Sequence, residues 1–118
     1  MQRRVVRLRV TQRMQTACPS RFARMVMRLD YGAGPTFSCP EEDERGEDCR
    51  VVRSALLDRY CQLGAPPEVV VESLVWHPTD STKAHFVEAF DVALEAAEKL
   101  VRGDSYEAPR WFTVEILG

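Results

Sequence analysis

The sequence predicts a single α+β domain in which one mixed sheet carries two helices on one face. Three segments alternate apolar and polar residues with the period of two that is typical of half-buried strands. Two others repeat apolar residues every three or four positions, as amphipathic helices do. A valine-rich segment between them supplies another strand. The predicted sheet has four strands, or five if a short segment at 36–39 joins it.

Bulk composition is that of an ordinary globular protein. A chain of 118 residues, 45% hydrophobic and 29% charged, is long enough to bury a core as one domain over residues 1–118. No apolar run approaches the roughly 20 residues of a membrane helix, and the basic N-terminus lacks a signal-peptide pattern. We therefore expect a cytoplasmic protein with no membrane partner. The four cysteines form no C-x-x-C pair, so no metal or cofactor is expected, and Cys49 and Cys61 are predicted to be buried thiols.

Residues 5–11 and 22–30 are predicted to form two antiparallel strands joined by a hairpin loop at 13–21. The apolar positions of both strands share one face: Val6, Leu8, Val10, Ala23, Met25, Met27 and Leu29. The opposite face carries four arginines: Arg7, Arg9, Arg24 and Arg28.

The middle of the chain is predicted to contain a short strand and the first helix. A glycine and proline turn at 31–35 leads to the strand at 36–39 and then to an acidic loop at 41–48. Helical spacing follows, with Asp48 as the expected N-cap and Gly64 as the residue that ends the helix.

The last third of the chain is predicted to be strand, helix and strand. Residues 68–76 are rich in valine, which suits a central strand. The second helix starts near Ser81 or Thr82 and ends near Gly103, with a stripe of phenylalanine and alanine residues facing the sheet. Alternation returns at 111–117.

This last third carries the more specific part of a family resemblance, whose order of elements extends over nearly the whole chain. This part begins with the segment Val75-Trp76-His77-Pro78-Thr79-Asp80-Ser81-Thr82 and continues with a helix that contains Phe86, Ala89, Ala93 and Ala97. It ends with Glu107-Ala108-Pro109 and the final strand. This order resembles domain IV of elongation factor G. The order is equally similar to that domain in the tetracycline-resistance ribosomal protection proteins. The likeness implies a fold like that of ribosomal protein S5 domain 2, including a left-handed βαβ crossover, an exception to the usual rule.

The resemblance also implies a site. In this family two loops at the tip of the domain reach into the ribosomal decoding region, and the matching segments here are 77–81 and 13–21. The implied RNA-binding residues are His77, Thr79, Asp80, Ser81, Arg13 and Arg21. The glycine-rich first loop of elongation factor G is absent from this sequence. There is no phosphate-binding loop either, so the chain is not expected to hydrolyse GTP by itself.

The first part of the chain is strongly basic. Residues 1–29 carry eight arginines and no acidic residue. Exposed on the sheet, Arg7, Arg9, Arg24 and Arg28 could bind the phosphates of an RNA. Alternatively, Glu72 and Glu115 on neighbouring strands neutralise part of this face. Only Phe22 is aromatic nearby, so stacking of bases on the sheet is not expected.

The turn at 77–81 allows more than one interpretation. His77, Asp80 and Ser81 are residue types of a hydrolytic triad, but a triad needs its members to converge around an oxyanion hole. Within so short a turn, capping of the next helix by Asp80, Ser81 or Thr82 is the simpler role, and it is compatible with RNA contact.

The function expected from these observations is a non-catalytic module that binds the ribosome or another structured RNA. The alternative is a protein interaction or assembly domain, including a homodimer, that keeps the fold without binding RNA. An enzyme is the weakest hypothesis, because the sequence has neither a glycine-rich phosphate loop nor a histidine-rich metal motif.

Overall fold

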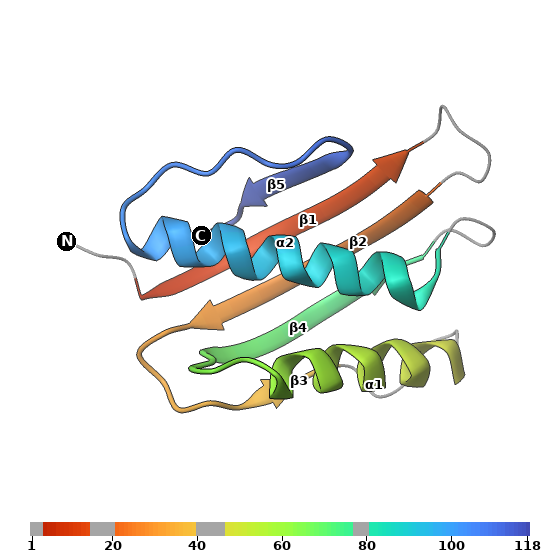
Figure 1. Cartoon of the computed structure of the whole chain (residues 1–118), viewed down its shortest axis with the longest axis horizontal. Coiled ribbons are helices and arrows are strands. Elements are labelled where there is room, and N and C mark those ends of the chain that lie inside the picture. The colour runs from red at the N-terminus through yellow and green to blue at the C-terminus, as the bar shows by residue number, and fades with distance from the viewer. Residues whose placement is uncertain (1–3, 15–20, 40–46, 77–80) are drawn as a thin grey trace.

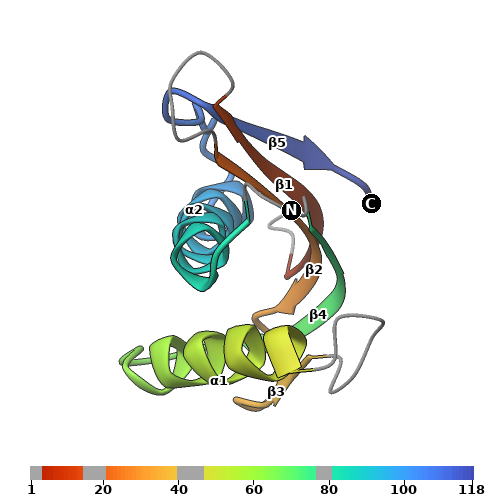
Figure 2. The same ribbon diagram turned by 90° about the vertical axis from the view of Figure 1, so that its right-hand side faces the viewer.

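Two helices cover one face of a five-stranded sheet, and neither of these described helices lies on the other face (Figure 1, Figure 2). The computed structural model describes residues 4–14, 21–39, 47–76 and 81–118, without the side chains of residues 21, 47 and 48. Its elements are β1 (Val5–Met14), β2 (Arg21–Asp30), β3 (Phe37–Ser38), α1 (Glu47–Cys61), β4 (Glu68–Val75), α2 (Lys83–Val101) and β5 (Phe112–Ile116).

The strand order in the sheet is β3-β4-β2-β1-β5. Three neighbouring pairs are antiparallel, and β3 with β4 is parallel, so the sheet is mixed. The predicted α+β class, with two helices and one mixed sheet, is confirmed. The short third strand does pair, which makes the sheet five-stranded.

The connection from β3 through α1 to β4 is left-handed. β3 and β4 are parallel neighbours, and α1 runs back over the same face that α2 covers (Figure 1, Figure 2). Figure 1 views the sheet from the helix side. Both strands point right in this view, and β4 lies above β3, which is the arrangement of a left-handed connection. About 98% of such connections have the opposite hand.

The core lies between the helices and the sheet. All seven apolar residues predicted to face inward from β1 and β2 are fully buried, as are Phe86 and Phe90 of α2. Small residues line the helix where it lies against the sheet, and Ala89, Ala93, Ala96 and Ala97 are fully buried. The alternation of the first two strands is therefore confirmed on its apolar side.

A β-bulge interrupts the pairing of β2 with β4. Val71 pairs with Met27 and Ser73 pairs with Val26, so Glu72 is the extra residue. Val71 and Leu74 are paired with the inward-facing Met27 and Met25, so Glu72 and Ser73 both lie on the open face of the sheet.

The first hairpin is longer than predicted. Arg13 pairs with Phe22 and Met14 pairs with Arg21, so Arg13 and Arg21 belong to β1 and β2 and not to a loop at 13–21. Backbone pairing continues past the apolar pattern because ladder hydrogen bonds do not require apolar side chains. Gln12 is only 3% exposed, and its Nε2 donates a hydrogen bond of 2.7 Å to Glu88, whereas its buried Oε1 has no hydrogen-bond partner among the described residues.

Several predicted boundaries are wrong. Helix α1 begins at Glu47, so Asp48 lies inside the helix and is not its N-cap. The helix ends at Cys61, which is exposed and not buried as predicted, whereas Cys49 is buried. Gly64 does not have a positive φ, so it is not a left-handed cap. At the end of α2, Gly103 does take that conformation, with φ 83°.

Neither α1 nor α2, the helices among the described residues, combines the length and the hydropathy that a membrane-spanning helix needs.

Candidate nucleic-acid interface

The described residues that flank segments 15–20 and 77–80 meet at one end of the sheet, which we call the loop end. Arg24 of β2 pairs with Val75 at the end of β4. The Ser81 hydroxyl donates a hydrogen bond of 2.8 Å to the carbonyl oxygen of Phe22. The start of α2 is thereby tied to the start of β2 (Figure 1). Ser81 and Arg13 both lie at this end, whereas His77, Thr79 and Asp80 lie outside the described residues.

Thr82 caps helix α2. Its backbone is extended, and its hydroxyl oxygen accepts a hydrogen bond of 3.4 Å from the backbone N–H of His85. Of the three residues considered for this role, Thr82 is the N-cap, and Ser81 holds the helix start against β2 instead.

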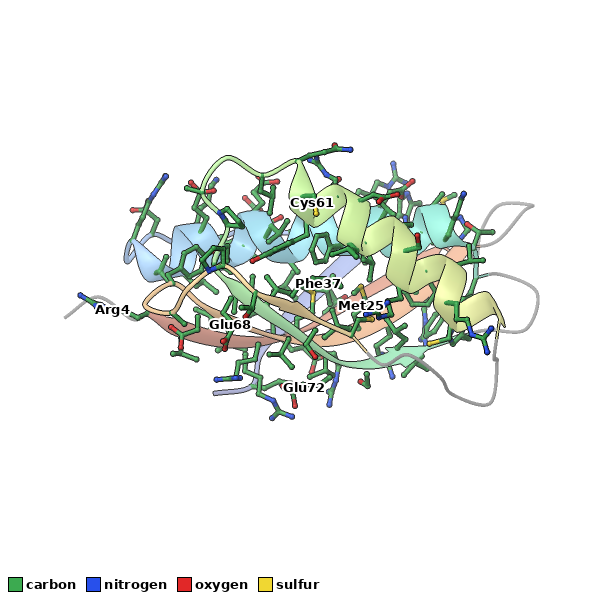
Figure 3. All side chains as sticks on the ribbon, turned by 90° about the horizontal axis from the view of Figure 1, so that it is seen from below. Arg4, Met25, Phe37, Cys61, Glu68 and Glu72 are labelled. Atoms are coloured by element: carbon green, nitrogen blue, oxygen red, sulfur yellow. The ribbon has the colours of Figure 1, made fainter. Side chains whose placement is uncertain are left out.

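Away from the loop end, the arginines of the open face are paired with carboxylates. Arg7 donates to Glu72 at 2.8 and 3.1 Å, and Arg9 donates to Glu115 at 3.1 Å. Arg28 contacts Glu68 at 3.2 Å. Figure 3 shows Glu72 on the side of the sheet away from the helices.

These pairs change the electrostatics of the face. The hydrogen bond to Arg7 lowers the pKa of Glu72, and the same bond raises the pKa of Arg7. The guanidinium groups stay partly exposed, with Arg7 at 45% and Arg28 at 43% of side-chain area. The protein's own carboxylates therefore neutralise Arg7, Arg9 and Arg28, as the alternative interpretation of this face expected. Glu68 was not predicted to be one of these carboxylates.

At the loop end the arginines are held by an aromatic ring instead. The guanidinium carbons of Arg13 and Arg24 lie 5.5 and 5.7 Å from the centre of the Phe22 ring. Arg24 also donates from Nε to the Thr11 hydroxyl at 3.1 Å. Among the described residues, neither Arg13 nor Arg24 forms an ion pair with a carboxylate. Their positive charges are therefore available to an external anion.

A tight turn before β5 brings the backbone of Trp111 next to the backbone of Arg13. The Phe112 N–H donates to the Pro109 carbonyl at 3.1 Å, and the Arg13 N–H donates to the Trp111 carbonyl at 2.9 Å. The guanidinium carbon of Arg110 lies 4.6 Å from the centre of the Trp111 ring. Trp111 is 37% exposed and has φ 76°, which keeps it out of the strand that was predicted to start there.

The sequence did not predict Phe22, Arg110 and Trp111 as candidate site residues. Nothing in their spacing connects them, since they meet only because β5 pairs with β1 and β1 pairs with β2. The one available signal was the adjacent arginine and tryptophan at the start of the last strand.

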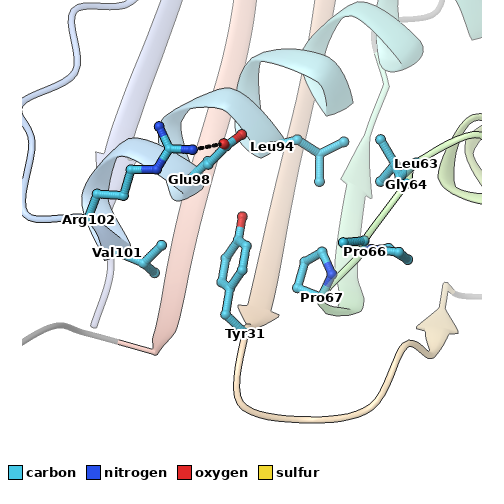
Figure 4. A pocket seen from close by; sticks show the side chains of 10 residues that line it. Tyr31, Leu63, Gly64, Pro66, Pro67, Leu94, Glu98, Val101 and Arg102 are labelled. Atoms are coloured by element: carbon cyan, nitrogen blue, oxygen red, sulfur yellow. Dashed lines mark hydrogen bonds and ion pairs between the residues drawn. The ribbon is translucent and has the colours of Figure 1, made fainter.

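A hollow of about 470 Å³ lies at the opposite end of the molecule (Figure 4). Its walls include Tyr31, Pro66, Leu94 and Val101. Burial raises the pKa of Tyr31 to about 12, and the nearby charge of Glu98 acts in the same direction. Tyr31 therefore remains a neutral hydroxyl at physiological pH. Among the predicted site residues whose side chains the structure describes, none lines this hollow.

Neither the protein-family models nor the curated proteins that were compared with the chain give a match.

Proposed function

We propose that this protein is a non-catalytic cytoplasmic module that binds structured RNA, such as that of the ribosome, with its loop end. The observation that carries the proposal is the contrast between two groups of arginines on one sheet face. Arg7, Arg9 and Arg28 are paired with carboxylates, whereas Arg13 and Arg24 have no carboxylate partner among the described residues. Unpaired guanidinium groups are well suited to phosphate oxygens, whose contacts dominate affinity for nucleic acid.

The fold supports the resemblance to domain IV of elongation factor G. A left-handed β3–α1–β4 connection is rare, and it has the hand that the resemblance implies. The flanks of segments 15–20 and 77–80 also lie together, as two loops acting at one tip require. Under this proposal, Arg13, Arg21 and Ser81 contact RNA, and so do His77, Thr79 and Asp80, which lie outside the described residues.

The proposed site includes fewer of the sheet-face arginines than the sequence predicted. Because Glu72, Glu115 and Glu68 already neutralise their arginines, Arg7, Arg9 and Arg28 contribute mainly to the protein's own sheet. Arg24 remains in the site.

Co-sedimentation with purified ribosomes over a series of salt concentrations tests the proposal. The double variant Arg13→Gln with Arg24→Gln should weaken binding and reduce the slope of log K against log salt by about 1.5 to 2, since two phosphate contacts are lost. The matched control, Arg7→Gln with Arg28→Gln, removes the same charge from the same face and should change the slope by less than about 1. Absence of co-sedimentation at low salt, or equal effects of both double variants, would refute the proposal.

A second candidate is a protein interaction or assembly domain that uses the open sheet face. It is favoured by exposed apolar residues on that face, with Val5 at 39% and Val75 at 41%, among charges that are largely paired. A homodimer through this face should bury more than about 1,000 Å² and should be weakened by Val75→Asp. Sedimentation equilibrium measures this, and a monomer at all concentrations would exclude the homodimer.

A further inference from the structure

We infer that the loop end holds a single-stranded RNA segment through five residues, Arg13, Phe22, Arg24, Arg110 and Trp111, which we call the arginine–aromatic cluster. This inference rests on the proposed function and adds the kind of RNA that the site recognises. It departs from the expectation that bases do not stack on this sheet, because the fold adds a tryptophan from a distant part of the sequence.

The cluster spans three adjacent strands. Phe22 of β2 is directly opposite Arg13 of β1, and the backbone N–H of Arg13 donates a hydrogen bond to the carbonyl oxygen of Trp111, the residue just before β5. Neighbouring strands lie about 4.8 Å apart, so the backbones of Phe22 and Trp111 are about 10 Å apart with Arg13 between them. The backbone of Arg13 therefore lies between those of two aromatic residues.

The cluster has the chemistry that unpaired nucleotides require. Bases that are not stacked in a duplex bind to aromatic rings and to the planes of guanidinium groups, while phosphates bind to the N–H edges. Phe22 holds the guanidinium groups of Arg13 and Arg24, and Trp111 holds that of Arg110, in a defined position relative to a ring. The side chains are thus arranged before any ligand binds.

The charge of the cluster is uncompensated. Within the part of the chain that the structure describes, Arg13, Arg24 and Arg110 form no ion pair with a carboxylate. The ion-paired Arg7, Arg9 and Arg28 lie on the same sheet but farther from this end. A polyanion is therefore attracted to the cluster more strongly than to the remainder of the face.

Trp111 occupies a backbone conformation that suits glycine. Its φ of 76° is in the left-handed region, where a bulky side chain is a genuine outlier. Such residues persist when the surrounding structure enforces them, and they concentrate at binding sites. A tryptophan at this position therefore fits a role of its side chain in binding, which outweighs the unfavourable backbone conformation.

The test compares three RNA probes by fluorescence anisotropy at low salt: an oligouridine strand of about 12 nucleotides, an abasic strand of the same length, and a duplex of the same length. The oligouridine strand should bind at least fivefold more tightly than the abasic strand, which carries the phosphates but no bases, because one base–aromatic stack contributes at least that factor. It should also bind more tightly than the duplex, whose bases are not available for stacking.

Variants locate the effect. Trp111→Gly suits the positive φ, so it should leave the thermal unfolding midpoint close to that of the natural chain while abolishing the preference for oligouridine over the abasic strand. Trp111→Phe keeps a ring and should retain the preference. Arg110→Gln should weaken binding of both strands, and the control Arg102→Gln, at the opposite end of α2, should weaken neither.

The outcomes separate the two proposals. Equal binding of the oligouridine and abasic strands, tighter binding of the duplex, or equally effective competition by a polyglutamate peptide would overturn the inference, even if ribosomes still co-sediment. Loss of ribosome co-sedimentation at low salt would instead remove the proposed function on which the inference rests.

Discussion

Tyr60 and Tyr106 differ in what their hydroxyl groups contact. The Tyr60 hydroxyl donates to the carbonyl oxygen of Pro67 at 2.6 Å in a buried position. The Tyr106 hydroxyl is also buried but has no hydrogen-bond partner among the described residues. Burial raises the pKa of both groups. The pair therefore allows the contribution of one hydrogen bond to be measured against a matched background.

Tyr60→Phe should lower the free energy of unfolding by about 1 to 2 kcal/mol, since it leaves the buried carbonyl oxygen of Pro67 without a donor. Tyr106→Phe should change it by less than about 0.5 kcal/mol or raise it, because no hydrogen bond is lost. Urea denaturation of both variants measures the difference. If Tyr106→Phe lowered the free energy of unfolding as much as Tyr60→Phe, the difference in hydrogen bonding between the two hydroxyl groups would be contradicted.

The raised pKa of Tyr31 predicts a loss of folding stability at alkaline pH. Its pKa is raised from 10.0 to about 12 in the folded state, so folding favours the neutral hydroxyl. The resulting stabilisation is fully present below pH 10 and is lost as the pH rises from about 10 to 12. Tyr31→Phe should therefore lose less stability than the natural chain over this range, as measured by urea denaturation at each pH. Parallel curves for the two proteins would show that Tyr31 titrates normally.

Helix α2 lies close to the sheet because its inner side is made of small residues. Ala89, Ala93, Ala96 and Ala97 are fully buried beside Phe86 and Phe90, and the stripe was visible in the sequence. Such a close approach leaves little room for a larger side chain. The strand alternation was equally readable, because one face of each strand had to be apolar.

Ala93→Leu should destabilise the protein by about 1 to 3 kcal/mol through overpacking against the sheet. The control Ala84→Leu makes the same change at an exposed position of the same helix and should alter stability by less than about 0.5 kcal/mol. Thermal and urea denaturation of both variants measure this. Equal effects would mean that α2 has room to move away from the sheet.

Other features of the elements could not be predicted, for physical reasons. The extension of β1 to Met14 depends on backbone pairing, which leaves no pattern in the side chains. The conformation of Trp111 is imposed by the turn and by its bond to Arg13, against its own preference. The ion pairs of Arg7, Arg9 and Arg28 depend on which strands are neighbours, so their partners could be suggested but not assigned.

At the scale of the molecule, the two ends of an elongated body differ in chemistry. The body measures 43 × 29 × 24 Å. The loop end carries arginines that have no carboxylate partner within the described part of the chain, and the opposite end carries the hollow with Tyr31. The sequence indicated basic residues in the first strands but not their division into paired and unpaired groups. That division follows from the sheet order, which no local pattern encodes.

Removal of residues 111–118 should have a global effect, since β5 supplies the pairing partner for one side of β1. Val114 and Ile116 pair with Val10 and Leu8, so the truncated chain would expose that edge of β1. We expect a lower unfolding midpoint and concentration-dependent light scattering. The same midpoint and no scattering would show that the sheet is stable with four strands.

The pairing of the last strand with the first also has a consequence for synthesis. Because translation proceeds from the N-terminus, β1 emerges about a hundred residues before the strand that lies along its edge. During that interval the nascent chain can form its hairpin and helices but cannot complete its sheet. The native sheet is thus expected to form only after residues 112–116 have left the exit tunnel of the ribosome.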